Sequence, residues 1–291
     1  MKASNPVRCH RFVGGVAHNI ACDMAALGTR SCLMSLVGQD ADGDGVIAET
    51  TKRGVDLALV ARSPTVKTAS YTAVLEPDGE LAIGLSDSQT YDQITPEFLK
   101  NHRDRLAQFK TIVVDANLPR ESLQWLVDNK GSARIFAAPV SPSKALHWRQ
   151  AMAGADVFIG NEREARCLTD QPAATISEAL HAARTLRKTG PSIAVITLGP
   201  QGAVVSGPDL EAHFAIVKTD VVDVNGAGDA FFAGFTHALH ADLPLTQAMM
   251  YGIATASLVA EHAGPVWDGL SPEHLNQRLQ SVPPETRYDP P

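Results

Sequence analysis

Short runs rich in β-branched residues alternate along this chain with stretches whose apolar residues recur every three or four positions. The runs are typical of buried strands, and we place strands at Ser31–Gly38, Thr111–Ala116, Arg134–Val140, Asp156–Ile159, Ile193–Leu198 and Val221–Val224. The stretches between them predict helices at Val16–Leu27, Thr95–Ala107, Glu121–Asn129, Ser177–Lys188, Gly228–Ala241 and Thr246–Glu261. This alternation predicts an α/β fold with a mostly parallel sheet covered by helices. We expect residues 1–291 to form a single domain.

Two segments depart from this rhythm. Thr68–Ser86 carries two alternating runs on either side of Glu76-Pro77-Asp78-Gly79, in which proline sets φ and glycine accepts a positive φ. This pattern predicts an antiparallel hairpin that projects from the main sheet. The proline-rich tail, residues 281–291, is expected to be loosely ordered.

Composition narrows the class of protein. Hydrophobic residues make up 44% of the chain and charged residues 20%, which is typical of a globular protein. A net charge of −7 argues against nucleic acid polymers and anionic membranes as partners. The four cysteines form no C-x-x-C pair, and no apolar run or signal-like start indicates a membrane or secreted protein. We therefore expect reduced thiols and a cytoplasmic location.

Polar residues follow several of the predicted strands. In a doubly wound sheet, ligands bind beyond the carboxyl ends of the strands, and these residues would gather at that edge. For any single residue, the alternative that loops are simply polar is at least as good. The residues are Asp115, Asn117, Ser141, Lys144, Asn161, Glu164, Thr197 and Asp223.

The segment Gly226-Ala-Gly-Asp229 links a predicted strand to an apolar helix. Such a turn exposes backbone N–H groups at a helix N-terminus, where the helix dipole also favours an anion such as a phosphoryl group. Asp229 could then take a proton from an attacking hydroxyl, or it could merely cap the helix. The spacing alone leaves these two interpretations equal, because the segment lacks the lysine of a P-loop.

Two longer segments carry a resemblance to a known family. Val222-Asp-Val-Asn-Gly-Ala-Gly-Asp-Ala-Phe-Phe-Ala-Gly-Phe235 resembles the C-terminal signature of the ribokinase-like, or PfkB-type, carbohydrate and nucleoside kinases. Gly14-Gly-Val-Ala-His-Asn-Ile-Ala21, continuing to Gly43, resembles the N-terminal signature. The resemblance covers nearly the whole chain. It implies an ATP-dependent kinase with a three-layer, doubly wound sheet and a small β lid formed near residues 5–13 and 66–86.

The resemblance assigns roles on the phosphate side of the site. Asp229 would be the catalytic base, and the backbone of Gly226, Ala227 and Gly228 would stabilise the migrating γ-phosphoryl group. Asn161 and Glu164 match an N-x-x-E motif in which the glutamate holds Mg²⁺ through water, although the same pair is also a common helix cap. The resemblance further implies nucleotide contacts from Thr197, Gly199, Gly202 and Asn225, and a monovalent cation such as K⁺ at Asp223.

On the substrate side, Gly14, Gly15 and Asn19 match positions that contact the sugar, and the lid would close over it and serve as a homodimer contact. Several local sequences, among them Asp115-Ala-Asn117-Leu-Pro119 and Pro139-Val-Ser-Pro-Ser-Lys144, are most similar to the pseudouridine kinases. This similarity implies phosphorylation of the 5′-hydroxyl of pseudouridine, with Asn117, Ser141 and Lys144 as candidate substrate contacts. A kinase for ribose, fructose or an adenosine-like nucleoside remains open.

The sequence also departs from the family pattern. The family opens with a β-strand and an aspartate that binds sugar hydroxyls, and the residues before Ser4 supply neither, so we expect the first strand to be missing from the sheet. His18 stands where pseudouridine kinases carry arginine, and Val224-Asn225 replaces a threonine-rich pair. A catalytically impaired nucleoside-binding protein is therefore the alternative from a different class.

Overall fold

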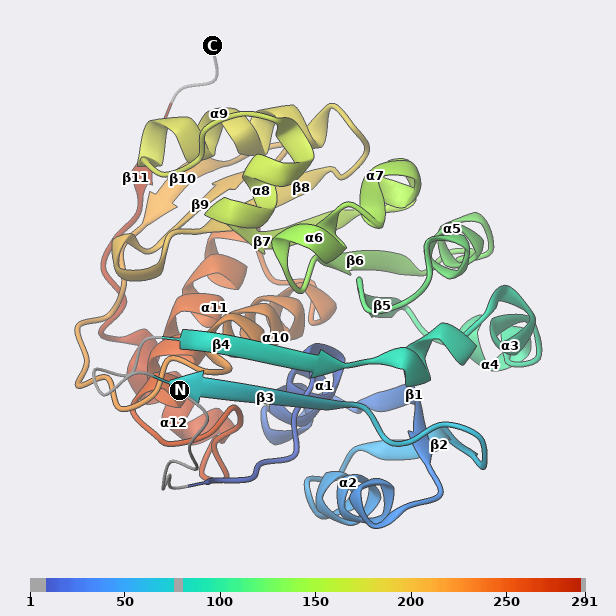
Figure 1. The fold of residues 1–291 in the computed structure, drawn as a ribbon. Helices are drawn as coiled ribbons and strands as arrows, with labels where there is room; N and C mark the ends of the chain where they lie inside the picture. The colour runs from blue at the N-terminus through green and yellow to red at the C-terminus, as the bar shows by residue number, and fades with distance from the viewer. Residues whose placement is uncertain (1–8, 76–80, 289–291) are drawn as a thin grey trace, which may run out of the picture.

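The computed structural model describes residues 9–75 and 81–288. Its main sheet is seven-stranded, in the order β11-β10-β9-β8-β7-β6-β5 (Figure 1). The strands are β5 (Thr111–Asp115), β6 (Arg134–Ala138), β7 (Val157–Asn161), β8 (Ile193–Thr197), β9 (Ala203–Ser206), β10 (Glu211–Phe214) and β11 (Thr286–Arg287). β5 to β8 pair in parallel, whereas β8 to β11 pair antiparallel. The predicted α/β fold with a mostly parallel sheet is confirmed.

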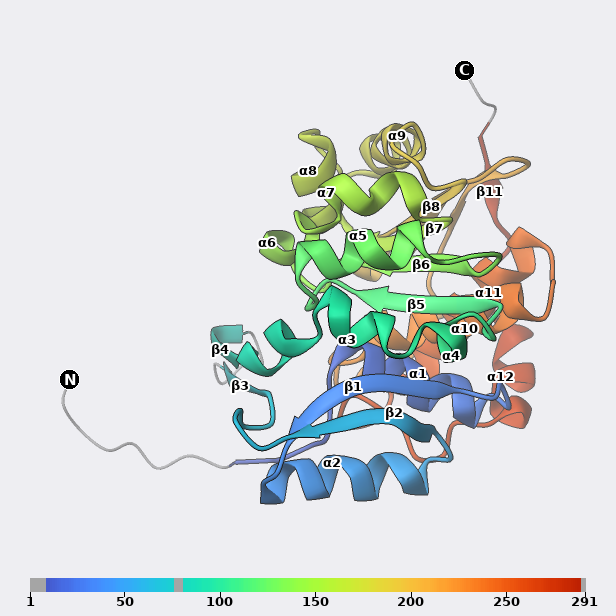
Figure 2. The ribbon, with the colours of Figure 1, turned by 90° about the vertical axis from the view of Figure 1, so that its right-hand side faces the viewer.

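Helices cover both faces of this sheet (Figures 1 and 2). One layer contains α5 (Arg120–Asp128), α7 (Trp148–Ala151), α8 (Glu162–Thr169) and α9 (Ile176–Arg187), and the other contains α1 (Val16–Ala26), α10 (Ala227–His240) and α11 (Leu245–Ala260). In β6, Ile135 and Ala137 pack into the first core, and Phe136 and Ala138 into the second. Burial on both faces explains why the central strands read as unbroken apolar runs.

The remaining elements are shorter or peripheral. The further helices are α2 (Ala41–Lys52), α3 (Pro96–Lys100), α4 (Arg103–Leu106), α6 (Pro142–Ala145) and α12 (Pro272–Leu279). Short 3₁₀ helices lie at Gln89–Gln93, Met152–Gly154 and Gly199–Gln201. None of the described helices is both long enough and apolar enough to cross a membrane.

β1 (Cys32–Gly38) and β2 (Asp56–Ser63) form a separate two-stranded parallel sheet. β1 runs alongside β5 in the same direction (Figure 2), but the described residues provide no ladder between these two strands. This break lies inside the molecule, between the two layers of helices.

The predicted hairpin is present as β3 (Ser70–Leu75) and β4 (Leu81–Asp87), which pair antiparallel. It crosses the carboxyl edge of the sheets as a ribbon (Figure 1). Tyr71, Val74, Ile83 and Leu85 are all exposed. The predicted turn at residues 76–80 and the first part of the proposed lid, residues 5–8, lie outside the described residues.

Three expectations about local structure differ from what is observed. Val221–Val224 is not a strand: its three valines are exposed, and the N–H groups of Val222 and Asp223 donate to the carbonyl of Ala260 at the end of α11. β-branched residues favour a strand, but none of the described strands pairs with this segment.

The predicted helix Thr95–Ala107 is divided into α3 and α4 by a break at Asn101–His102. In the tail expected to be loosely ordered, Thr286 and Arg287 form β11 by pairing with His213 and Ala212 of β10. Both cases show tertiary contacts overriding local sequence preference.

Candidate active site

The first turn of α10 is the candidate anion site. Gly226 precedes it with φ of 81°, and a Cβ at this position would overlap the carbonyl of Pro265, so only glycine fits. The N–H of Ala227 donates to the Val224 carbonyl over 3.2 Å. The N–H groups of Gly228 and Asp229, in the first helical turn, have no intrahelical acceptor. The backbone N–H of Ala227 was expected to hold phosphate, but in this structure it donates within the loop.

Asp229 faces this anion site from the same helical turn. Its Oδ2 accepts a hydrogen bond from Asn19 Nδ2 over 2.7 Å, which links α10 to α1. Burial raises the pKa of Asp229 to about 7, the Asn19 bond opposes that rise, and the nearby carboxylates of Asp115 and Glu164 add to it. A carboxylate with a pKa near 7 is suited to accept a proton at neutral pH.

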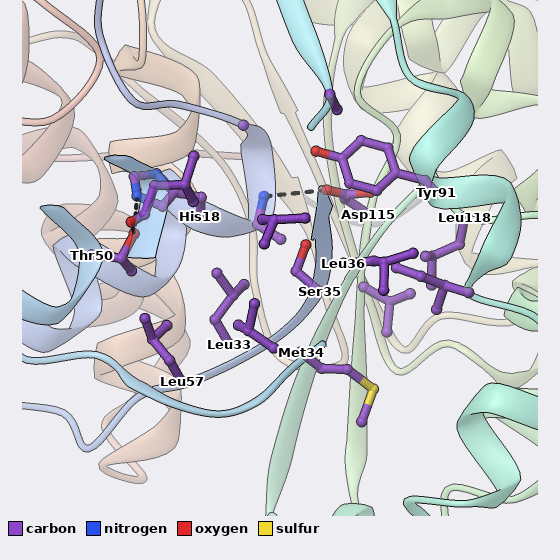
Figure 3. Close-up of a pocket in the computed structure, with 18 of the residues that line it drawn as sticks. His18, Leu33, Met34, Ser35, Leu36, Thr50, Leu57, Tyr91, Asp115 and Leu118 are labelled. Atoms are coloured by element: carbon purple, nitrogen blue, oxygen red, sulfur yellow. Dashed lines mark hydrogen bonds between the residues drawn. The ribbon is translucent and has the colours of Figure 1, made fainter. Parts of the chain in front are cut away.

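A buried polar chain holds Asn19 in place. His18 Nδ1 lies 3.1 Å from Asn19 Oδ1. His18 Nε2 lies 3.0 Å from Thr50 Oγ1 (Figure 3). Because Asn19 donates an amide hydrogen to Asp229, the Asn19 oxygen accepts from a protonated Nδ1 of His18, and Nε2 is an acceptor. The Thr50 hydroxyl donates to the Val46 carbonyl, so the donor to Nε2 is the Cys22 thiol, whose Sγ lies 3.5 Å away. Burial lowers the pKa of His18, so this ring is neutral. The chain fixes the orientation of the Asn19 amide toward Asp229.

Asp115 lies at the carboxyl end of β5, close to this chain. Its Oδ2 accepts from the Ala17 N–H over 3.3 Å, and its Oδ1 accepts from the Asn117 N–H over 2.9 Å. Asn117 Oδ1 accepts from Lys144 Nζ, which also lies 3.4 Å from the hydroxyl of Ser88, just after β4. Asn117 and Lys144 are thus brought together at the base of the hairpin.

The other substrate-side candidates lie around the same opening. Gly14 and Gly15 are exposed at the start of α1, where Gly15 has φ of 123°. Ser141 caps α6 by accepting from the Lys144 N–H over 3.4 Å. Val140, just before Ser141, has φ of 69°, a rare conformation for a β-branched residue that is found most often at functional sites.

Asn161 and Glu164 lie where β7 meets α8, and they form a complete capping box. Asn161 Oδ1 accepts from the N–H groups of Arg163 and Glu164, each over 3.0 Å, and Glu164 Oε2 accepts from the Asn161 N–H over 2.8 Å. Burial raises the pKa of Glu164. Since Glu164 also raises the pKa of Asp229, the two carboxylates share one electrostatic environment that a divalent cation would stabilise.

The nucleotide-side candidates follow β8. Thr197 ends that strand, and the Leu198 N–H donates to the Gly202 carbonyl over 2.7 Å, which closes a tight loop containing Gly199. Gly202 has φ of 90°, and a Cβ there would overlap the carbonyl of Phe214. This loop is therefore held by backbone geometry that requires glycine.

Asp223 organises the loop before the anion site. Its Oδ1 accepts from both the N–H and the Nδ2 of Asn225, over 2.9 Å and 2.8 Å, and its Oδ2 accepts from the Gly264 N–H over 3.0 Å. Asn225 is thus bonded to Asp223. The described residues contain no group of three or more His, Cys, Asp or Glu side chains that could hold a metal ion.

Three buried or partly buried groups near the site have no chemical role assigned from the sequence. Asp115 is predicted to lie at the ligand edge of the sheet without a stated role, and His18 is noted as a departure from the family pattern. Asp23 of α1 is not predicted from the sequence: it is fully buried, neither carboxylate oxygen has a hydrogen-bond partner among residues 9–75 and 81–288, and burial raises its pKa to about 8. The sequence signal that could have revealed it is an aspartate at an apolar position of the predicted helix Val16–Leu27.

Comparison with known proteins identifies the family. The profile of the pfkB family carbohydrate kinases matches residues 2–268. The pseudouridine kinase of Escherichia coli K12 is 29% identical over 256 residues, covering 88% of this chain and 82% of the relative. The guanosine-inosine kinase of Exiguobacterium acetylicum is 27% identical over 267 residues, covering 90% and 87%.

Solved structures agree with this assignment. A carbohydrate kinase from Agrobacterium tumefaciens superposes with a TM-score of 0.86 at 29% identity, covering 99% of this chain and 92% of that one. The Arabidopsis thaliana ribokinase complexed with ribose and ATP gives a TM-score of 0.81 at 20% identity, covering 92% and 87%, which shows a shared fold. The chain belongs to the pfkB family, and it is an ATP-dependent carbohydrate or nucleoside kinase with the ribokinase-like fold.

Proposed function

We propose that this kinase transfers the γ-phosphoryl group of ATP to the 5′-hydroxyl of pseudouridine. The observation that carries the proposal is the pairing of Asp229 with the orphan N–H groups of its own helical turn, in a chain similar over 88% of its length to a pseudouridine kinase. The Asp229 carboxylate accepts the proton of the hydroxyl. The hydroxyl oxygen bonds to the γ-phosphorus while the bond to the bridging oxygen of ADP breaks, and the helix N–H groups stabilise the transferring charge.

The rest of the site would support this step. Asn19 orients Asp229, Asn117 and Lys144 supply hydrogen bonds to the acceptor, and the loop at Gly202 borders the nucleotide. Mg²⁺, when bound, would neutralise phosphate charge near Glu164. K⁺ near Asp223 is a further part of the proposal. The β3–β4 hairpin would close over the acceptor, and its exposed apolar side chains suit it to pair with a second copy of the chain.

A panel of acceptors tests the substrate assignment. Purified protein with Mg-ATP is assayed for ADP release with pseudouridine, uridine, guanosine, inosine, ribose and fructose. We expect kcat/KM for pseudouridine to exceed that for each other acceptor by about tenfold or more, which corresponds to roughly 1.4 kcal/mol of transition-state discrimination. A preference for guanosine or inosine would instead transfer the assignment to a purine nucleoside kinase. Calorimetric binding of pseudouridine without ADP release would support an impaired binding protein.

Glu164 offers a test that separates metal binding from helix capping. Glutamine at N3 can complete the same capping box, so Glu164→Gln should leave the melting temperature unchanged. Loss of the negative charge should raise the Mg²⁺ concentration needed for half-maximal activity about tenfold. An unchanged Mg²⁺ dependence would leave Glu164 with only its capping role.

A further inference from the structure

The hydrogen-bond chain that holds Asn19 is compatible with two arrangements of its protons. An amide group that turns by 180° exchanges its oxygen and nitrogen but fills the same space, and a neutral imidazole can carry its proton on either nitrogen. Asn19 and His18 are both buried. Each arrangement must therefore satisfy these groups with partners inside the protein.

The ionised arrangement is the one that fits a charged Asp229. Asn19 Nδ2 donates to Asp229 Oδ2 over 2.7 Å, and Asn19 Oδ1 accepts from His18 Nδ1 over 3.1 Å. His18 Nε2 then carries no proton, and its donor is the Cys22 thiol, whose Sγ lies 3.5 Å away. Burial raises the pKa of Cys22 to about 12, so this group keeps its hydrogen. A thiol is a weak donor, however, so this end of the chain is weakly held.

Thr50 fits the opposite tautomer of His18. Thr50 Oγ1 lies 3.0 Å from His18 Nε2 (Figure 3), and the Thr50 hydroxyl donates to the carbonyl of Val46. An oxygen whose hydrogen is engaged elsewhere can only accept, so an unprotonated Nε2 places two lone pairs against each other. A proton on Nε2 would turn this contact into a hydrogen bond of good length. Thr50 therefore favours the Nε2–H tautomer, whereas Cys22 favours the Nδ1–H tautomer.

The protonated arrangement contains the Nε2–H tautomer and requires the amide of Asn19 to turn. His18 Nδ1 is then an acceptor, so Asn19 presents its nitrogen to His18 and its oxygen to Asp229. Two oxygens separated by 2.7 Å need a hydrogen between them, and a protonated Asp229 supplies it. Each contact along the chain then joins a donor to an acceptor. The two arrangements thus correspond to the two protonation states of Asp229.

We propose that His18 and the Asn19 amide form a switch that follows the proton on Asp229. When Asp229 is ionised, His18 carries its proton on Nδ1; when Asp229 holds a proton, the amide turns and His18 carries its proton on Nε2. The chain gains one proton overall, at Asp229, because His18 loses one from Nδ1 and gains one at Nε2 by exchange with solvent, to which 6% of its surface is exposed.

The inference rests on the proposed role of Asp229 as the base. A fixed Asn19 donor would favour only the charged carboxylate, whereas a turning amide can bond to Asp229 both before and after it takes the proton of the acceptor hydroxyl. His18, Cys22 and Thr50 act through Asn19 and are positioning residues.

Four charged or titratable groups face the switch from the surrounding elements. They are Asp23 of α1, Arg53 at the end of α2, Asp115 of β5 and Glu164 of α8. Burial lowers the pKa of His18, the bond to Asn19 opposes this effect, and Arg53 adds to it. Burial and the carboxylates of Asp115 and Glu164 raise the pKa of Asp229 to about 7. His18 therefore stays neutral while Asp229 gains and loses its proton.

Nitrogen NMR of His18 tests the switch without any acceptor, so its failure is distinct from failure of the proposed reaction. In protein labelled with ¹⁵N-histidine, the two ring resonances report which nitrogen carries the proton, and the spectrum of His18→Gln assigns them. We expect mainly Nδ1–H at about pH 8.5 and mainly Nε2–H at about pH 6, with the midpoint at the protonation of Asp229. In Asp229→Leu this change with pH should disappear. A tautomer of His18 that stays constant over this range in the unaltered protein would overturn the proposal.

Two variants at the outer contacts of His18 should move the pH profile in opposite directions. Cys22→Ala removes the donor of the ionised arrangement, so the acidic limb of kcat/KM should move upward by about 0.3 pH unit. Thr50→Val removes the acceptor of the protonated arrangement, so the limb should move downward by about 0.5 pH unit. Thr50→Ser keeps the hydroxyl and is the matched control, with no movement expected.

The profile is measured with whichever acceptor of the panel is phosphorylated, so it does not depend on the substrate being pseudouridine. A structural role for Cys22 and Thr50 would lower activity without moving the limb. That result, or shifts of the same sign in both variants, would sink the switch.

Discussion

The two sides of the active site satisfy their buried polar groups very differently. On the nucleotide side, Glu164 is buried but bonded within a capping box, and the loop at Gly202 is fixed by backbone contacts. On the acceptor side, no described residue forms a hydrogen bond with the Asp23 carboxylate, and Asp229 accepts one from Asn19. The pKa values of both aspartates are raised to near or above neutrality. The nucleotide side is a completed structural unit, whereas the acceptor side buries two aspartates whose charged forms are unfavourable.

The largest expected effect lies on the acceptor side. Asp229→Asn keeps the shape of the side chain but removes the proton acceptor, so kcat should fall by about 10²–10⁴ with little change in the KM for ATP. The melting temperature should not fall, because a buried charge is removed. Steady-state kinetics and thermal unfolding measure the two quantities. Unchanged kcat would mean that the acceptor side does not perform proton transfer.

The free energy of unfolding should depend on pH because Asp23 of the acceptor side is buried. Its pKa rises from an ordinary value near 3.8 to about 8 on folding, so the folded state favours the protonated form. That stabilisation is complete below pH 4 and is lost as the pH rises through 8. Asp23→Asn should therefore stabilise the protein by about 2–4 kcal/mol at pH 9 and by little at pH 4. Denaturant unfolding at both pH values checks this, and an equal effect at each would contradict it.

Two glycines of the anion loop form a matched pair. Gly226→Ala should destabilise the protein by about 1–3 kcal/mol, because its φ of 81° and the Pro265 carbonyl exclude a side chain. Gly228→Ala meets no atom within 4 Å and lies in a helix, so it should stabilise the fold by roughly 0.5–1 kcal/mol. Chemical denaturation of both variants separates backbone strain from a general intolerance of alanine.

The smallest effect concerns the orientation of the base. Asn19→Leu removes the donor that holds down the pKa of Asp229, so this pKa should rise. The acidic limb of the kcat/KM profile should then move upward by about one pH unit. A variant at the outer end of the polar chain, Thr50→Val, serves as the control and should shift the limb less. A purely structural role for Asn19 would lower activity without moving the limb.

The sequence predicted the parts of this molecule that depend on local pattern. The buried strands β5 to β8 were located because apolar residues face both layers. For the segment Gly226–Asp229 the local pattern left an anion loop and a helix cap equal, and only the family resemblance favoured the anion loop. The valines of Val221–Val224 led to a wrong strand prediction. Strand preference is a local property, whereas a strand also needs a neighbouring strand with which to pair. The hydrogen bond from Asn19 to Asp229 joins residues far apart in the chain, and the burial of Asp23 depends on other parts of the fold. No local sequence pattern encodes either feature.

The turn that we propose to bind phosphate is positioned by main-chain atoms, since Gly226 packs against the carbonyl of Pro265 and Asp223 bonds to the Gly264 N–H. The segment that carries Pro265 continues to Trp267, whose ring stacks on His262 with centroids 4.1 Å apart. We expect a change that repacks this outer stack to shift the proposed turn, because the connecting peptide units are rigid. Variation remote from both reactants would then adjust the alignment of the transferred group.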